Sequence, residues 1–234
     1  MPNIEIREFS DLDSLTIASV EYFVGLHDPP NKQTFLVPGG QTPFLFYKHL
    51  AVTINDWAGT NLLLSDERLV PEKNNMSNVG MVKKQFFDNI NSETPPHIVE
   101  VVGKSNLTDS EQILASLNDY TKTLLPLTAA FLGIGSDGHT ASLFPQFEDL
   151  FFNPNLFFKV DRPSEPFSRI SVSANVITET PQIFFLVSGS EKQSVMRTIV
   201  KTPNNKDIVI FVSSLSQLKN TEFLPDSDFY LKSN

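Results

Sequence analysis

The sequence contains no cysteine, and its 18 Lys and Arg are outnumbered by 27 Asp and Glu. The absence of thiols excludes disulfide bonds, zinc–thiolate sites and a cysteine nucleophile, so any metal would need His and carboxylate ligands. The few basic residues form no cluster, and the formal net charge is −9. Because phosphate-backbone binding needs a concentrated basic face, this charge pattern argues against a nucleic-acid partner.

Long hydrophobic runs are also missing. No apolar stretch is long enough to cross a bilayer, and residues 1–8 lack the basic segment and apolar run of a leader peptide. We therefore expect a soluble, unprocessed protein of the cytoplasm with no membrane partner. The hydrophobic content of 40%, with 20 Phe, suffices for a sizeable core. Without internal repeats or long linkers, residues 1–234 are interpreted as a single domain.

Short apolar runs alternate with stretches of helical spacing along the chain. The expected strands are Thr34–Val37, Asn61–Ser65, His97–Val102, Ala129–Ile134, Arg169–Ser173, Ile183–Val187 and Ile208–Val212. The expected helices include Leu15–Leu26, a segment from Pro43 through Leu50, Val79–Ile90, Leu114–Leu124 and Glu191–Val200. This rhythm predicts an α/β fold, a Rossmann-like and largely parallel sheet flanked by helices. The Phe- and Pro-rich residues 146–166 are typical of loops around short strands, which predicts a small additional β-rich element.

Start signals precede most of these helices. They are capping boxes at Ser10 with Asp13 and Thr108 with Glu111, a capping Ser77, and Thr42 as N-cap with Pro43 in the first helical position.

The first segment of chemical interest is Gly39-Gly40-Gln41-Thr42-Pro43. Two glycines before a helix N-terminus offer backbone N–H groups without side-chain obstruction, an arrangement suited to a phosphate. The same residues also suit a simple Gly-Gly turn with a capping Thr.

The second segment, Asp66-Glu67-Arg68, directly follows an apolar strand, and Ser77 and Asn78 lie further along the same loop. Ligands of parallel α/β sheets bind outside the carboxyl ends of strands, so these side chains are expected to face the site. The alternative is a solvated turn in which Arg68 pairs with Glu67 or Asp66.

The third segment runs from Gly133 to Pro145 and contains His139, which follows a predicted strand inside a Gly-rich turn. Histidine is the natural base near neutral pH. We expect Gly135 and Gly138 to bend the backbone. Thr140 and Ser142 should cap a short helix that Pro145 ends. The remaining histidines, His27, His49 and His97, are expected to be structural or superficial.

Together the three segments resemble the signature segments of the 6-phosphogluconolactonases. Glucosamine-6-phosphate deaminases share a Gly-rich first loop and a Gly-His third loop, but residues 137–145, Asp-Gly-His-Thr-Ala-Ser-Leu-Phe-Pro, are similar to the lactonase version. Arg169-Ile170 and Gly189-Ser190-Glu191-Lys192 extend the resemblance over most of the chain. The sequence departs from the pattern at Gln41, where the family usually has Ser, and in residues 223–228.

The resemblance implies hydrolysis of 6-phosphoglucono-1,5-lactone to 6-phosphogluconate, with His139 as general base. Asp137 and Asp66 would orient His139 or accept bonds from sugar hydroxyls. Arg68 and Lys192 would bind the phosphate.

The substrate-binding set would be completed by Gly39, Gly40, Gln41 and Thr42. The oxyanion could be stabilised by Arg68 or by backbone N–H groups near Gly39 and Gly40, and the sequence leaves both open. Arg68 is therefore a candidate for catalysis as well as binding.

No cofactor and no metal are expected, and the partner is a small sugar-phosphate lactone. We expect a monomer with a functional link to glucose-6-phosphate dehydrogenase. Two rival functions remain: an isomerase resembling glucosamine-6-phosphate deaminase, and a sugar-phosphate sensor without catalysis.

Overall fold

The computed structural model describes residues 4–40, 43–102, 109–192 and 207–213. Its main sheet has seven strands whose neighbours are all parallel. In spatial order they are β1 (Ile4–Phe9), β10 (Asp207–Ser213), β9 (Gln182–Ser188), β6 (Ala129–Gly133), β2 (Gln33–Val37), β3 (Thr60–Leu64) and β5 (His97–Val99). A second, antiparallel sheet contains β4 (Asp66–Arg68), β8 (Arg169–Val172) and β7 (Phe157–Val160). The prediction of a largely parallel sheet with a small β-rich element is confirmed.

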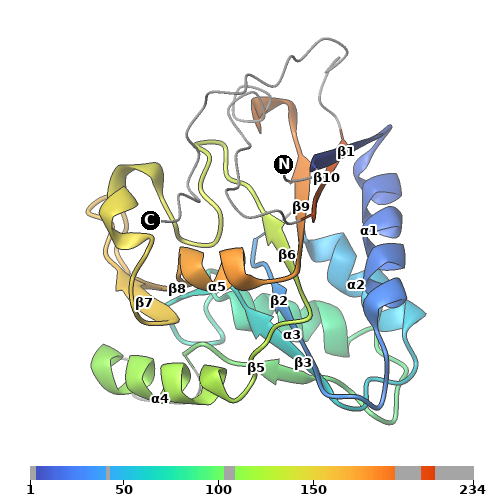
Figure 1. Cartoon of the computed structure of the whole chain (residues 1–234), viewed down its shortest axis with the longest axis horizontal. Helices are drawn as coiled ribbons and strands as arrows, with labels where there is room; N and C mark the ends of the chain where they lie inside the picture. The colour runs from blue at the N-terminus through green and yellow to red at the C-terminus, as the bar shows by residue number, and fades with distance from the viewer. Residues whose placement is uncertain (1–3, 41–42, 103–108, 193–206, 214–234) are drawn as a thin grey trace.

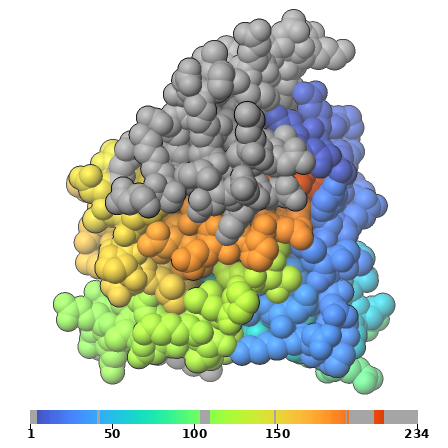
Figure 2. Space-filling view, in the orientation of Figure 1, coloured from blue at the N-terminus to red at the C-terminus, as the bar shows by residue number. Residues whose placement is uncertain are grey.

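Helices cover both faces of the main sheet (Figure 1). They are α1 (Leu12–Leu26), α2 (Phe44–Thr53), α3 (Asn78–Phe87), α4 (Ser110–Lys122) and α5 (Ala174–Glu179). α1 packs beside α2 and α2 beside α3, which makes one layer, while α4 and α5 follow the return of the chain across the other face. Figure 2 shows this second face, with green α4 along one border, orange α5 in the middle and the blue α1 segment along the opposite border.

The core between sheet and helices is rich in phenylalanine. Phe23 of α1 lies 4.1 Å from Phe35 of β2 and 5.5 Å from Phe131 of β6, measured between ring centroids. Phe131 in turn stacks on Phe184 of β9 at 4.6 Å. All four rings are buried. They join α1 to the three central strands, so the strand ends that carry the polar loops rest on a packed base.

The order of the strands places a switch point between β2 and β6. From β2 the chain proceeds to β3 and β5 in one direction, then returns to the opposite side of β2 as β6 and continues to β9 and β10. The loops that follow β2 and β6 therefore diverge and leave a crevice at the carboxyl ends of the strands. In open α/β sheets this crevice is where ligands bind.

The helix starts differ in detail from the predictions. Asp11 caps α1 and Asp109 caps α4, each accepting a bond from the third residue on, in place of the expected Ser10 and Thr108. The capping role of Ser77 is confirmed by its bond from Gly80 N. The helix α2 begins one residue late, because Pro43 takes the N-cap position. Ser, Thr and Asp all cap well, so a run of them leaves the register open.

The segment before Pro145 also departs from expectation. No helix forms over residues 140–144; Pro145 instead begins a 3-10 helix, η1 (Pro145–Leu150). Ala141 has φ +51°, a left-handed conformation that interrupts a right-handed helix. The strand expected over His97–Val102 ends at Val99. Strands β1, β4 and β7 were not predicted as elements, and the helix expected over Glu191–Val200 lies outside the described residues beyond Lys192.

Candidate active site

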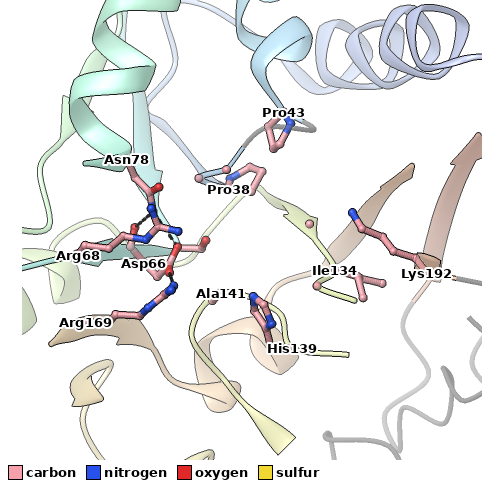
Figure 3. A pocket seen from close by; sticks show the side chains of 15 residues that line it. Pro38, Pro43, Asp66, Arg68, Asn78, Ile134, His139, Ala141, Arg169 and Lys192 are labelled. Carbon is pink, nitrogen blue, oxygen red and sulfur yellow. Dashed lines mark hydrogen bonds and ion pairs between the residues drawn. The ribbon is translucent and has the colours of Figure 1, made fainter. Parts of the chain in front are cut away.

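A pocket of about 140 Å³ opens at the carboxyl ends of four neighbouring strands, β9, β6, β2 and β3 (Figure 3). The loop after β2 contributes Pro38, Gly39, Gly40 and Pro43, and the ends of β3, β4 and α3 contribute Ser65, Asp66, Arg68 and Asn78. The third segment contributes Gly133, Ile134, Gly135, His139 and Ala141. The lining is completed by Arg169 of β8 and by Lys192, which follows β9. The structure therefore brings together residues from all three segments singled out in the sequence.

His139 points into this pocket (Figure 3), and its ring is paired with Asp137. The Nδ1 of His139 lies at hydrogen-bond distance from Oδ1 of Asp137, and an ionised carboxylate can only accept, so Nδ1 carries the proton. Burial raises the pKa of Asp137, but the hydrogen bond and charge of His139 outweigh it and leave that pKa below its ordinary value of 3.8. The carboxylate therefore stays ionised near neutral pH and accepts the Nδ1 proton, so in the neutral imidazole the lone pair is on Nε2.

A tight turn presents this pair. Gly135 N donates to His139 O at 2.8 Å and Gly138 N donates to Gly135 O at 3.1 Å. Gly135 is needed because a Cβ there would lie 2.2 Å from the His139 ring. The buried Phe144 also packs against that ring, with centroids 4.5 Å apart.

The sequence could assign Glu67 either to the site or to an ion pair with Arg68. In the structure its carboxyl group instead binds backbone N–H groups and so has a structural role. Its Oε1 accepts bonds from the backbone N–H groups of Arg68 at 2.7 Å and Asn78 at 2.8 Å, and Oε2 accepts from Val79 N at 2.7 Å. Burial raises the pKa of Glu67 above its usual 4.5, against the lowering effect of these three bonds. The carboxyl group satisfies the first N–H groups of α3 and so fixes the start of that helix beside the pocket.

Arg68 is left without a carboxylate partner among the described residues. One terminal nitrogen donates to Met76 O at 2.7 Å, while Nε is buried and has no hydrogen-bond partner in that same part of the chain. The expected alternative of an ion pair between Arg68 and Glu67 or Asp66 is therefore not what the structure contains. A half-buried guanidinium at a pocket wall, with one donor left without a partner in the described part of the chain, is suited to an anionic ligand.

Asp66 is held by protein groups on both carboxylate oxygens. Oδ1 accepts a bond from Asn78 Nδ2 at 3.1 Å, and Oδ2 accepts one from Ser142 Oγ at 2.6 Å. The guanidinium of Arg169 lies 3.6 Å from Oδ2. Asp66 borders the pocket, but its first contacts are with neighbouring loops.

Arg169 is a pocket residue that the motif analysis did not assign to the site. It stands directly opposite Arg68 in the pairing of β4 with β8. Two like charges in this register would repel, but Glu165 binds Arg169 through Nε at 2.8 Å and a terminal nitrogen at 2.9 Å. In the sequence Arg169 opens an apolar strand and belongs to the family resemblance, but no local signal indicates that this strand pairs with Asp66–Arg68.

The other predicted residues divide between the pocket and more distant positions. Gly39, Gly40 and Lys192 line the pocket, whereas Gln41 and Thr42 lie outside the described residues. The histidines expected to be structural or superficial bond elsewhere: His27 with Thr60, His49 with Asp13 and His97 with Asn61. Within the described ranges no three His, Asp or Glu side chains group as metal ligands, and no helix is long and apolar enough to span a membrane.

Fold and site thus define a doubly wound α/β protein whose pocket at the switch point combines a histidine paired with Asp137 and an arginine without a carboxylate partner in the described part of the chain. Residues 24–217 match the family described as glucosamine-6-phosphate isomerases/6-phosphogluconolactonase, and the chain belongs to this family.

Two curated relatives agree. A 6-phosphogluconolactonase of Haemophilus influenzae is 33% identical over 173 residues, which cover 70% of this chain and 72% of the relative. The 6-phosphogluconolactonase 3 of Saccharomyces cerevisiae is 27% identical over 242 residues, covering 97% and 96%.

Solved structures share the fold. The crystal structure of a 6-phosphogluconolactonase from Thermotoga maritima has a TM-score of 0.76 at 24% identity, covering 90% of this chain and 100% of that one. A monomeric glucosamine-6-phosphate deaminase reaches a TM-score of 0.73 at 16% identity, covering 90% and 97%. The fold is therefore common to both activities, and only the site can separate them.

Proposed function

We propose that the protein hydrolyses 6-phosphoglucono-1,5-lactone to 6-phosphogluconate, the lactone-opening step of the oxidative pentose phosphate pathway. The observation that carries the proposal is that His139, paired with Asp137, lies in the same pocket as Arg68, which has no carboxylate partner among the described residues. The relatives named as 6-phosphogluconolactonases support it.

In the proposed reaction His139 is the general base. Its Nε2 takes a proton from a water molecule as the water oxygen attacks the lactone carbonyl carbon. The tetrahedral intermediate then collapses, the bond between this carbon and the ring oxygen breaks, and His139 returns the proton to the leaving ring oxygen. Asp137 accepts the hydrogen bond from Nδ1–H of His139 in both steps. It therefore holds the neutral ring in the Nδ1–H tautomer and stabilises the imidazolium that forms between the two steps.

Arg68 is proposed to bind the phosphate. Its buried Nε has no partner in the described part of the chain, and Gly39 and Gly40 lie in the same pocket ahead of the α2 N-terminus. A phosphate there would accept hydrogen bonds from the Arg68 guanidinium and gain from the positive end of the helix. Lys192 stands on the opposite wall, with His139 between the two cations (Figure 3), and adds attraction for an anionic substrate.

The function is tested with freshly generated 6-phosphogluconolactone in a coupled assay from which the spontaneous hydrolysis is subtracted. We expect His139→Ala to lower kcat by about 10²- to 10⁴-fold, the usual contribution of a general base, with the fold and the affinity for 6-phosphogluconate retained. His49→Ala is the matched control, since His49 bonds to Asp13 away from the pocket. A wild-type rate equal to the spontaneous rate refutes the function, and a His139→Ala variant as fast as wild type refutes the role of His139.

The same preparation distinguishes the isomerase alternative. A deaminase would release ammonia from glucosamine-6-phosphate, whereas the proposed lactonase would not. The monomeric state and the cytoplasmic location expected from the sequence are part of the proposal, and gel filtration and cell fractionation check them.

A further inference from the structure

The loop that carries His139 is attached to the rest of the pocket through Ser142. This side chain is 1% exposed and follows His139 by three residues. Its Oγ donates to Oδ2 of Asp66 at 2.6 Å, and its backbone N–H donates to Ser171 Oγ of β8 at 3.0 Å. Both partners belong to the small antiparallel sheet, so Ser142 links the loop after β6 to the β4–β8 pair.

The Asp66 end of this link is itself rigid. Asn78 holds the other carboxylate oxygen, and Arg169 approaches Oδ2 and Ser142 Oγ at 3.6 and 3.4 Å. Glu165 holds the guanidinium of Arg169 in place by accepting hydrogen bonds from two of its nitrogens. Arg169 therefore restricts the movement of the Asp66 carboxylate. Asp66 and Arg68 lie two positions apart on the same short strand, β4. A residue that is hydrogen-bonded to Asp66, as Ser142 is, is therefore held at a fixed distance from Arg68.

The other hydrogen bonds of the loop do not provide such a link. Thr140 Oγ1 donates to Gly133 O at 2.9 Å and Gly135 N to His139 O, so both stay within the segment that leaves β6. They shape the turn around His139 but do not fix it relative to the opposite wall.

We infer that Ser142 is a positioning residue, which acts through Asp66 to hold His139 at a fixed place relative to Arg68. The inference rests on the proposed function. A substrate whose phosphate is held at one wall presents its lactone carbonyl at a set distance, and the base must meet it there. Since a misplacement of about 1 Å can cost about 100-fold in rate, one buried hydroxyl in this position matters for turnover.

The test compares two buried serines. Ser142→Ala is expected to lower kcat for the lactone by about 10- to 100-fold, with KM and product affinity changed less than about threefold, because the groups that bind the phosphate stay in place. Ser173→Ala is the matched control, since Ser173 is equally buried and its Oγ has no hydrogen-bond partner among the described residues. It should keep the wild-type kcat. If Ser142 is merely structural, Ser142→Ala lowers the melting temperature but leaves kcat of the folded protein unchanged.

A double-mutant cycle with Asp66→Asn tests the route of the effect. If Ser142 acts through Asp66, the double variant turns over no more slowly than Asp66→Asn alone. Losses that multiply contradict this route. Should Ser142→Ala fail to fold, Ser142→Cys keeps the size with a weaker donor, and it must show the same loss in kcat at constant KM. An inactive wild type overturns the proposed function together with this inference, whereas an active wild type with an unchanged Ser142 variant overturns the inference alone.

Discussion

Gly135 offers a direct test of how sharply the His139 ring must be placed. A Cβ built on Gly135 lies 2.2 Å from both Cε1 and Nδ1 of His139 and 2.8 Å from Oδ1 of Asp137. Ordinary contact begins at 3.4 Å, so 3.4 Å less 2.2 Å leaves a retreat of about 1.2 Å that Gly135→Ala forces on the ring. Phe144 also packs against the ring, at 4.5 Å between centroids, so the ring has little room to move without losing its present position in the pocket.

A shift of this size is expected to lower kcat by about 100-fold. The loop is near the surface, with the Asp137 side chain 44% exposed, so the global fold should tolerate the change. The assay is steady-state lactone hydrolysis, accompanied by thermal unfolding to confirm folding. Gly25→Ala in α1 is the control for the added methyl group, because a Cβ there meets nothing within 4 Å. Gly135→Ala with wild-type kcat would show that the position of the ring does not limit turnover, which contradicts His139 as a base that must meet the lactone carbonyl at a set place.

Two further predictions concern binding and stability. Lys192→Ala should raise KM about tenfold with a smaller change in kcat, because it removes attraction present in ground and transition states, while Lys159→Ala, which loses a surface pair with Asp161, should change neither. Glu67→Gln should lower the free energy of unfolding by about 1–3 kcal/mol at pH 4, since an amide nitrogen would face a backbone N–H of α3. Because burial raises the pKa of Glu67, its contribution to stability is full below pH 4.5 and is lost as the pH rises through the folded-state pKa, so the wild-type advantage should shrink toward pH 7 in urea unfolding. An advantage that grows with pH contradicts this sign.

The main sheet could be predicted because its central strands are short, apolar and bounded by turn residues. β2, β6 and β9 are buried on both faces, so each appears in the sequence as a continuous apolar run. The edge strand β1 contains Glu5, Arg7 and Glu8, so its sequence lacks the continuous apolar run by which the central strands were predicted. β4 is three residues long and polar throughout, so its strand character comes only from pairing with β8.

The site divides in the same way. Local sequence indicates which loops carry chemistry, because the Gly, His and Asp of the third segment and the Gly pair of the first are adjacent in the chain. Contacts over long separations leave no such signal. Ser142 and Asp66 are 76 residues apart, and Arg169 reaches the pocket only because its strand lies opposite Arg68. Glu67 is the opposite case. It stands between two site candidates in the sequence, Asp66 and Arg68, but its carboxyl group accepts hydrogen bonds from the first N–H groups of α3.

These separations bear on what the small antiparallel sheet does. His139 follows β6 and Arg68 follows β3, and β2 stands between those strands in the main sheet. The main sheet therefore holds the two residues on different sides of the switch point, each at the end of its own loop. β8 closes the gap, because it pairs with β4 on one side and receives the Ser142 backbone through Ser171 on the other. If a chain kept all three motifs but lost these contacts, it would still contain every residue of the proposed chemistry. The distance between the base, His139, and the anion-binding Arg68 would no longer be fixed, and the reaction requires that distance.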